Sequence, residues 1–518
     1  MPIPTTSSAR AEAVAPTGKP DWAAAEARAA ELVAPWAAEE GAPGGAILAF
    51  DTHSIPVAVA AGLESLSTGA AFSADSVVRY ASVTKHVLAA MQRRHRDRVA
   101  LGHPLGRHLP ELRGPMAEVS VGRALDMTGG LPDVRETLSL LGLSVHTATD
   151  AAPLLDFIAS LGALNFPAGR EISYSNTGYR LVETALARQG IVFDDWVQAE
   201  IGAPLGIAWR APETWFDPIP GLVPGYWKGA MGWQLGNAGL HLSASGSLTG
   251  SGRALAIWGQ AVLANRGPAA GLLAEQAAPR HLLDGRATAY GLGLAHGRLG
   301  PVALVGHGGS HAGYKTYLLL APEPGLGIVV VSNREDTGAY GLALRTMAAL
   351  LGQEMPPPAS LPEGLYAEPG TGHWLEVTGN TASFLGASEV LYQGDAGWAV
   401  SLSAHNPMRL RAEGSGIEGE IGHVARHFRP VAAEAVPAAA QGPWRCPAYH
   451  AGFDIEGETL ATGIGPARMT ARLRPLGEGR LLATLPDGPW NKQFSLSFKG
   501  DEVALVSHRS RVLRFRRG

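Results

Sequence analysis

A serine and a lysine three residues apart, Ser82 and Lys85, stand where a polar stretch gives way to a helical pattern. Val87, Leu88 and Met91 recur at the spacing of one buried helix face, which predicts that Ser82 opens a helix. Residues three apart on a helix are neighbours, so the Ser82 hydroxyl and the Lys85 amine would be close together. A lysine shielded from water has a lowered pKa and can take the proton of a serine, which activates a nucleophile. For this pair alone, a surface lysine after a helix cap is the alternative.

Tyr174 and Asn176 belong to a second polar segment, which runs from Phe166 to Tyr179. A tyrosine in a loop rich in Pro and Gly can bring its phenol to the serine and lysine as a proton relay to a leaving group. The Asn176 amide can donate to a substrate carbonyl and orient it. For Tyr174, the alternative is an ordinary buried tyrosine whose hydroxyl group is hydrogen-bonded.

A third segment follows the apolar run that begins at Val302, and it contains His307, Gly308, Gly309 and Ser310. Glycines after a strand let a substrate backbone come close, and the Ser310 amide can join that of Ser82 in an oxyanion hole. His307 and His311 have the spacing of a helical metal pair, but two glycines between them argue against a helix. We therefore expect neither a metal ion nor an organic cofactor.

The elements that must hold these segments form a sheet built from distant parts of the chain and covered by helices. An Ala/Glu-rich stretch predicts a helix over 21–40, with Asp21 as its cap. The remaining expected elements are strands at 45–50, 55–60, 302–306, 314–320 and 327–332 and a helix at 340–351.

Beyond this first section the pattern changes to short strands separated by Gly, Asn and Asp turns, which is typical of small β-barrels or sandwiches. Three consecutive prolines mark a stiff linker before it, and a second interruption divides it. The predicted organisation is a flexible segment 1–20, a catalytic domain 21–351, a linker 352–364, a β-barrel 365–431, a linker 432–442 and a β-barrel 443–518.

Composition excludes several classes of protein. The 518 residues carry a formal net charge of −4, so there is no basic excess for nucleic-acid binding. Cys446 is the only cysteine, which rules out an intrachain disulfide and a multi-cysteine metal site. No targeting signal and no apolar run of membrane-spanning length is visible, and the expected location is the cytoplasm.

The order Ser-x-x-Lys, Tyr-x-Asn, His-x-Gly resembles the three active-site motifs of the penicillin-recognising serine hydrolases. The sequence segments around these motifs resemble the family as well: Tyr80-Ala-Ser-Val-Thr-Lys85, Thr128-Gly-Gly-Leu-Pro-Asp133, Phe166-Pro-Ala-Gly-Arg170 and Tyr174-Ser-Asn-Thr-Gly-Tyr179. The resemblance implies an α+β fold like that of β-lactamases and DD-peptidases, with a helix-covered antiparallel sheet and a helical subdomain. Two small antiparallel β-barrels are expected to follow it.

The third motif departs from a common pattern of the family, Lys-Thr-Gly. Lys315-Thr316 is followed by Tyr317 and does not fit, so we expect the site to lack the cation that would hold a substrate carboxylate. A histidine at His307 resembles the aminopeptidase and amidase branch. With two barrels following, the resemblance implies a serine aminopeptidase that releases N-terminal D-residues, notably D-alanine, with glycine or D-serine as alternatives.

In that branch a loop of the last barrel enters the active site, and Ala483–Gln493 is the matching stretch here. Its only carboxylate, Asp487, could pair with a substrate ammonium, although Pro-Asp-Gly-Pro is also an ordinary turn. The resemblance further implies a homodimer, a peptide or amino-acid amide as substrate, and β-lactams as inhibitors. No nucleic acid and no membrane is expected as a partner.

The combined hypothesis is an acyl-enzyme mechanism with Ser82 as nucleophile, Lys85 as base, Tyr174 as relay and His307 nearby. The alternatives are a D-stereospecific esterase, amidase or β-lactamase-like hydrolase, or a non-catalytic penicillin-binding sensor. Four further histidines have metal-like spacings but no third ligand at a fixed distance, so a structural or surface role is preferred for His103, His108, His423 and His427. The basic run 93–98 is interpreted as a solvated face.

Overall fold

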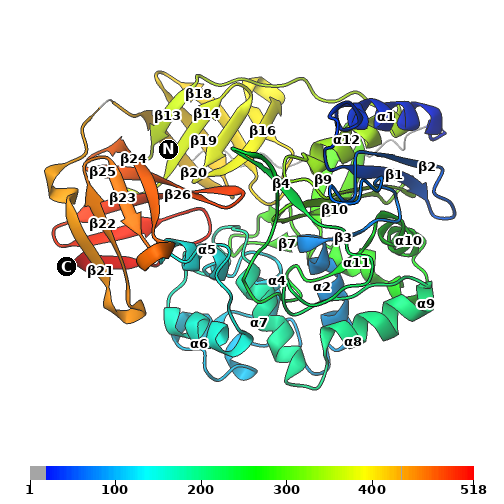
Figure 1. Ribbon diagram of the computed structural model, residues 1–518, viewed down its shortest axis with the longest axis horizontal. Helices are drawn as coiled ribbons and strands as arrows, with labels where there is room; N and C mark the ends of the chain where they lie inside the picture. Colours follow the sequence, from blue (N-terminus) through cyan, green and yellow to red (C-terminus); the bar gives the residue numbers. More distant parts are fainter. Residues whose placement is uncertain (1–18, 433) are drawn as a thin grey trace.

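The computed structural model describes residues 19–432 and 434–518. A helix-and-sheet domain comes first and two β-barrels follow it, side by side at one end of the molecule (Figure 1). The predicted flexible segment 1–20 lies outside the described residues except for its last two positions. No helix in the described ranges is long and apolar enough to cross a membrane.

A six-stranded antiparallel sheet forms the centre of the first domain, in the order β2-β1-β12-β11-β10-β9. Its strands are β1 (Gly45–Asp51), β2 (Val57–Ala61), β9 (Ala295–Leu299), β10 (Val302–His311), β11 (Tyr314–Ala321) and β12 (Leu326–Ser332). Because β1 pairs with β12, the two ends of the domain's sequence meet inside the sheet, as predicted. Strand β10 continues to His311, five residues beyond the predicted end, because Gly308 and Gly309 pair with Tyr317 and Thr316 of β11.

Helices cover both faces of this sheet. Helix α1 (Trp22–Ala38), capped by Asp21 as predicted, packs with α12 (Ala339–Leu351) on one face. Helices α2 (Thr84–Arg94) and α10 (Gly252–Leu263) cover the other face. Successive side chains of strand β1 point to opposite faces of the sheet. Ile47 therefore packs under α1 and α12, and Leu48 packs on the face that α2 and α10 cover.

The middle of the domain is mainly helical and carries the polar segments. Its remaining helices are α3 (Gly114–Glu118), α4 (Val121–Leu125), α5 (Val134–Leu140), α6 (Ala151–Leu161), α7 (Asn176–Ala187), α8 (Phe193–Val197), α9 (Ala203–Leu205) and α11 (Leu272–Gln276). Three two-stranded ribbons complete it: β3 (Val77–Arg79) with β6 (Thr249–Ser251), β4 (Tyr226–Gly229) with β5 (Gly232–Leu235), and β7 (Arg280–His281) with β8 (Ala287–Thr288).

Two closed eight-stranded antiparallel barrels follow, which confirms the predicted pair of β modules. The first barrel consists of β13 (Gly364–Ala367), β14 (Trp374–Thr378), β15 (Thr381–Phe384), β16 (Ala387–Gln393), β17 (Ala399–Ser401), β18 (Met408–Glu413), β19 (Gly416–Ile421) and β20 (Val424–Pro430). The second barrel consists of β21 (Gly442–Cys446), β22 (Ala451–Glu456), β23 (Thr459–Thr462), β24 (Met469–Gly477), β25 (Arg480–Asp487), β26 (Trp490–Lys499), β27 (Glu502–Val506) and β28 (Arg514–Arg517). Each barrel has an apolar core; Leu476, Leu482 and Val506 of the second barrel pack into the core of the first, and Leu140 and Leu141 of the first domain pack into the core of the second.

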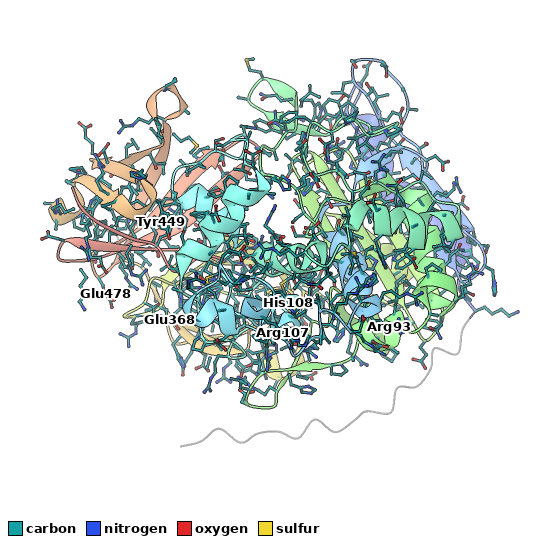
Figure 2. All side chains as sticks on the ribbon, turned by 90° about the horizontal axis from the view of Figure 1, so that it is seen from below. Arg93, Arg107, His108, Glu368, Tyr449 and Glu478 are labelled. Atoms are coloured by element: carbon teal, nitrogen blue, oxygen red, sulfur yellow. The ribbon has the colours of Figure 1, made fainter. Side chains whose placement is uncertain are left out.

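The barrels contact each other and the first domain through both apolar and polar groups. Between the barrels, Arg480 donates to the Glu368 carbonyl at 2.7 Å, and Glu478 accepts from the Gly370 amide at 3.1 Å; Figure 2 labels both acids at this end. Tyr449 of the second barrel donates to the Ser160 carbonyl of α6 at 3.3 Å (Figure 2). These contacts hold the barrels against the domain that carries the three motifs.

Candidate active site

Ser82 lies in a short 3₁₀ turn, η1 (Ala81–Val83), directly before α2. Ala81 has a φ of 49°, the left-handed region that non-glycine residues rarely occupy, so the turn at Ser82 is strained. A Cβ placed on Gly309 would lie 2.0 Å from the Tyr80 carbonyl oxygen, because strand β10 presses against this turn. The absence of a side chain at Gly309 thus lets strand β10 pack directly against the turn at Tyr80, which places the third segment beside Ser82.

Lys85 is completely buried, one helical turn after Ser82. Its Nζ donates to Ser82 Oγ at 3.0 Å, to Asn176 Oδ1 at 2.8 Å and to the Ser245 carbonyl at 2.5 Å. Burial lowers the pKa of Lys85 well below its ordinary value, although the charge of Asp133 opposes this shift. A lysine with such a pKa is able to act as a base near neutral pH.

Tyr174 lies on the other side of the serine, and its hydroxyl donates to Ser82 Oγ at 2.6 Å. Burial raises the pKa of Tyr174, so the phenol holds its proton. The Arg509 guanidinium lies over the Tyr174 ring at 4.5 Å and opposes that shift. Ser82 therefore has two groups suited to proton transfer within hydrogen-bond distance.

Asn176 and Asp133 hold this arrangement together. Asp133 Oδ2 accepts from the Asn176 backbone amide at 2.7 Å and from its Nδ2 at 2.8 Å, which turns the amide oxygen towards Lys85. Asp133 also caps α5, and Asn176 begins α7. The Asn176 side chain lines the cavity beside Ser82, but its observed partners are Lys85 and Asp133.

His307 lies in the same cavity but contacts neither the Ser82 nor the Lys85 side chain directly. Its Nδ1 is 2.6 Å from the Gly308 carbonyl and its Nε2 is 2.9 Å from the Tyr290 hydroxyl. Burial lowers the pKa of His307 well below its usual range, which keeps the ring neutral. Its ring centroid is 6.3 Å from that of Tyr174, so it supports the tyrosine from behind.

The remaining residues of the third segment also line the cavity: Gly308, Gly309 and Ser310. Lys315, opposite Ser310 in the β10–β11 ladder, lines it too; its Nζ donates to Ser310 Oγ and Glu335 Oε1, both at 2.6 Å. The cavity wall nevertheless contains other cations, since Arg135 and Arg509 line it as well. The neighbouring strand and the barrels supply charges that the missing Lys-Thr-Gly pattern did not reveal.

The structure does not bring Asp487 into this cavity. Ala483–Gln493 is a tight hairpin of β25 and β26 rather than an open loop. Both Asp487 carboxylate oxygens accept from the Val145 amide, at 2.9 and 3.0 Å, and Oδ1 also accepts from Ser144 Oγ at 2.7 Å. Its side chain is only 3% exposed, so its contacts join the second barrel to the first domain.

Barrel residues that the sequence analysis missed also line the cavity, which has a volume of about 480 Å³; Glu389, His405 and Arg509 are among them. Glu389 lies in β16, and His405 lies between β17 and β18 of the same barrel. Arg509 lies between β27 and β28 of the second barrel. No fixed spacing connects them to Ser82, although the polar His508–Arg511 stretch that follows the apolar strand β27 could have been identified as a loop.

His405 completes an aromatic cluster around Tyr174. The two rings meet edge to face at 5.4 Å, and the His405 centroid lies 4.7 Å from that of His307. Burial lowers the pKa of His405 to about 3, so this histidine is neutral at physiological pH. It packs against the tyrosine without adding a charge.

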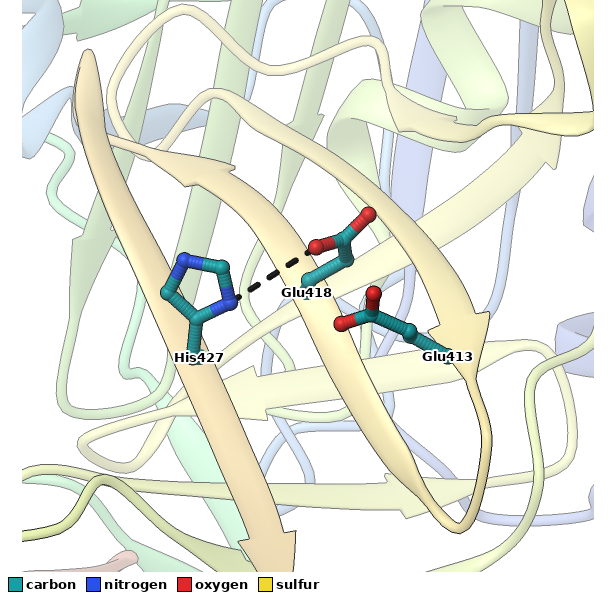
Figure 3. A group of neighbouring side chains, drawn as sticks. All are labelled: Glu413, Glu418 and His427. Carbon is teal, nitrogen blue, oxygen red and sulfur yellow. Dashed lines mark ion pairs between the residues drawn. The ribbon is translucent and has the colours of Figure 1, made fainter. Parts of the chain in front are cut away.

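The histidine pairs with metal-like spacings do not join the cavity. His103 Nδ1 lies 3.1 Å from His108 Nε2, in a contact away from Ser82. Figure 3 shows the one group in the described ranges with ligand atoms close enough for an ion: Glu413, Glu418 and His427 on the first barrel. Glu418 there already binds Arg411, and Glu413 and His427 are exposed, which is typical of a solvated strand surface.

Known proteins match this architecture in sequence and in structure. A family model described as Beta-lactamase matches residues 26–353. A protein of Cereibacter sphaeroides named D-aminopeptidase is 25% identical over 284 residues, which are 54% of this chain and 53% of that protein. The chain thus spans about half the length of the curated relatives it matches.

Two solved structures share the fold at low identity. The octameric penicillin-binding protein homologue from Pyrococcus abyssi superposes with a TM-score of 0.55 and 17% identity, covering 94% of this chain and 99% of its own. The D-amino acid amidase from Ochrobactrum anthropi SV3 gives a TM-score of 0.53 and 21% identity, covering 64% of this chain and 98% of its own. The second match is shorter than the first and covers about the length of the catalytic domain.

Proposed function

Because the chain belongs to the beta-lactamase family, we propose that it is a serine aminopeptidase releasing N-terminal D-amino acids, D-alanine above all. The observation that carries the proposal is the contact of Ser82 Oγ with both Lys85 Nζ and the Tyr174 hydroxyl. The names of the curated relatives support the substrate class, since they are D-aminopeptidases.

The reaction begins when neutral Lys85 takes the proton of Ser82 and Oγ attacks the carbonyl carbon of the N-terminal residue. The backbone amides of Ser82 and Ser310 stabilise the oxyanion. Tyr174 then gives its proton to the departing amine, and the proton on Lys85 restores the phenol. The same groups, used in reverse, activate the water that releases the amino acid from Ser82.

The burial of Lys85 is what makes this sequence possible near neutral pH. A solvated lysine would be an ammonium ion and would have no free electron pair for the serine proton. Asn176 and the Ser245 carbonyl hold the amine in place, so it stays directed at Oγ through each proton transfer.

A substrate panel with one variant tests the proposal. The p-nitroanilides of D-Ala, L-Ala and Gly are compared in the native protein and in Ser82→Ala. We expect turnover of the D-Ala compound to exceed that of the L-Ala compound, and Ser82→Ala to lower it by on the order of 10⁴-fold or more. Ser67→Ala, at an exposed serine outside the cavity, is the matched control. Full hydrolysis by Ser82→Ala would falsify the mechanism.

The same panel separates the alternatives. A D-stereospecific esterase, amidase or β-lactamase-like hydrolase would cleave acylated substrates as well as free amines. A penicillin-binding sensor would keep a stable Ser82 adduct, visible as a persistent mass increase after a slow β-lactam is added. With an aminopeptidase, the β-lactam either forms a Ser82 adduct that is hydrolysed, or it inhibits competitively and forms no adduct.

The oligomeric state is a separate part of the proposal: we propose that the chain forms a homodimer. The protein of Pyrococcus abyssi that shares the fold is described as octameric, so an octamer is the alternative to a dimer. Light scattering on the purified chain gives the mass directly, and a mass of eight copies would replace the dimer.

A further inference from the structure

One carboxylate in the cavity has no part in the mechanism above. Glu389 lies in β16 of the first barrel, opposite Ala382 of β15, and lines the cavity that contains Ser82. Among the described residues that line this cavity, Glu389 is the only acid, whereas Arg135, Arg180 and Lys315 are among its cations. The cavity therefore has one acidic position in a wall that is otherwise basic or neutral.

Glu389 has no cationic partner in the described part of the chain. Burial raises the pKa of Glu389 to about 8, and the only group that opposes this shift is the Ser403 hydroxyl. A buried carboxylate without a counterion is costly, so its environment favours either a proton or an incoming cation. The side chain is only partly buried by the protein itself, because one side faces the open cavity.

The neighbours of Glu389 are also suited to a cation. Tyr317 and Tyr340 stack at 4.9 Å and line the same cavity; burial raises the pKa of both phenols, and Glu389 adds to this shift. Aromatic faces attract ammonium groups through their quadrupole. The Tyr340 hydroxyl donates to the Leu402 carbonyl at 2.8 Å and is thereby directed away from Glu389.

Glu389 is also connected to the reacting serine through a short chain of contacts. Ser403 lies in the loop that carries His405, and the His405 ring packs on Tyr174, which donates to Ser82 Oγ. An N-terminal residue bound at Ser82 has its ammonium one carbon from the reacting carbonyl. A cavity of about 480 Å³ that holds both residues can enclose such a substrate.

We propose that Glu389 binds the ammonium group of the substrate and imposes the requirement for a free N-terminal amine. This inference rests on the proposed aminopeptidase function and assigns the amine to the first barrel. Asp487, the candidate from the sequence, has its two oxygens occupied by Ser144 and Val145. Binding of an ammonium at Glu389 forms a charge-assisted hydrogen bond and removes the cost of an unpaired buried carboxylate.

Glu389→Gln tests the proposal, because it keeps the shape of the side chain and removes its charge. We compare kcat/KM for D-alanine p-nitroanilide with kcat/KM for propionic p-nitroanilide, which lacks only the amine. The variant is expected to lose about 100-fold on the amine substrate, mainly through KM, and less than about threefold on the propionyl compound. Glu389→Asp should recover part of the loss, and Glu413→Gln, an exposed glutamate of the same barrel, should match the native protein.

The outcomes distinguish this inference from the function on which it rests. If the native protein prefers the amine substrate and Glu389→Gln keeps that preference, Glu389 does not bind the ammonium, while the aminopeptidase function stands. If the native protein shows no preference for the amine, both proposals fail. If Glu389→Gln lowers only the hydrolysis of D-lysine and D-arginine anilides, Glu389 binds a basic side chain and the proposal is overturned.

Discussion

The two barrels share one topology, eight antiparallel strands closed in sequence order, yet they bring different ionisable groups to the cavity. The first barrel supplies the carboxylate of Glu389 and the neutral ring of His405. The second supplies the guanidinium of Arg509, above Tyr174. The barrel frame therefore does not determine the chemistry, which depends on a few residues at one end of each barrel.

The barrels also differ in how tightly their loops are held. The Arg509 backbone accepts from the Asp133 amide at 2.9 Å and donates to Glu136 Oε1 at 3.0 Å, and Ser510 accepts from Thr137 at 2.8 Å. The His405 loop is anchored to the first domain by the bond from Tyr340 to the Leu402 carbonyl and by packing of Ala404. The Arg509 loop is thus held to the first domain by several hydrogen bonds, and the His405 loop by one hydrogen bond and apolar packing.

One acid connects the first domain to both barrels, and its removal is expected to have the largest effect. Glu171 Oε1 accepts from Arg511 of the second barrel at 2.8 Å and lies 3.4 Å from Arg426 of the first. All three side chains are less than 10% exposed. Glu171→Ala removes the ion-pair partner of buried Arg511 and one of the two carboxylates beside Arg426, which keeps Glu368 at 3.2 Å. We therefore expect a loss of about 3 kcal/mol in the free energy of unfolding. Denaturant unfolding measures it.

Glu26→Ala, at an exposed position of α1 without an ion pair in the described residues, is the control for that experiment. A Glu171→Ala protein as stable as this control would mean that the barrels are held by packing alone. Glu171 would then not be the residue that holds both barrels to the first domain.

Asp487 sharpens the contrast between the barrels. Its bonds to Ser144 and Val145 are structural, so Asp487→Asn should cost about 2 kcal/mol of stability, as expected for hydrogen bonds to a charged group. The ratio of activity on D-alanine p-nitroanilide to that on its propionyl analogue should stay unchanged. A collapse of that ratio would move recognition of the amine from the first barrel to the second.

Arg509→Ala tests the cation of the second barrel. The charge of Arg509 lowers the pKa of Lys85 and of Tyr174, so its removal raises both. Lys85 acts as a base only when neutral; the rise of kcat/KM with pH should therefore move to higher pH. At neutral pH we expect about a tenfold loss, which equals about 1.4 kcal/mol for a charge near the reacting groups. Arg509→Lys should restore much of the rate, and an unmoved pH profile would contradict this role.

The smallest effect is expected for His405→Phe. The pKa of His405 is about 3, so the ring carries no charge above pH 5 and its contribution is contact with Tyr174 and His307. A phenyl ring keeps that contact, and kcat/KM should fall by less than about threefold with the pH profile unchanged. Loss of a limb of the pH profile near pH 6 would show that the histidine titrates during the reaction.

The sequence predicted the part of the site that local spacing determines. Ser82 and Lys85 come together because residues three apart share a helix face, and Tyr174 and Asn176 because a short turn leads into α7. The β10–β11 hairpin was predicted as well, but its length was not, because glycines at 308 and 309 suggest an end of the strand when read alone.

The barrel residues could not be predicted for a physical reason. Glu389 and Arg509 reach Ser82 only through the closure of each barrel and its docking on the first domain. Both depend on buried contacts such as Glu171 with Arg511, far apart in the sequence. Asp487 was chosen as the only carboxylate of the stretch that resembles an active-site loop, and its hydrogen bonds to the Val145 amide show that it joins the barrel to the first domain instead.

Arg509 lies between the last two strands of the chain, so it reaches Tyr174 only after the second barrel has folded. Ser82, Lys85 and Tyr174 emerge early in synthesis, but the cation above the tyrosine arrives only when β28 pairs with β21 and closes the second barrel. The charge of Arg509 that lowers the pKa of Lys85 thus comes from the end of the chain opposite to the lysine itself, and it depends on the pairing of β28 with β21.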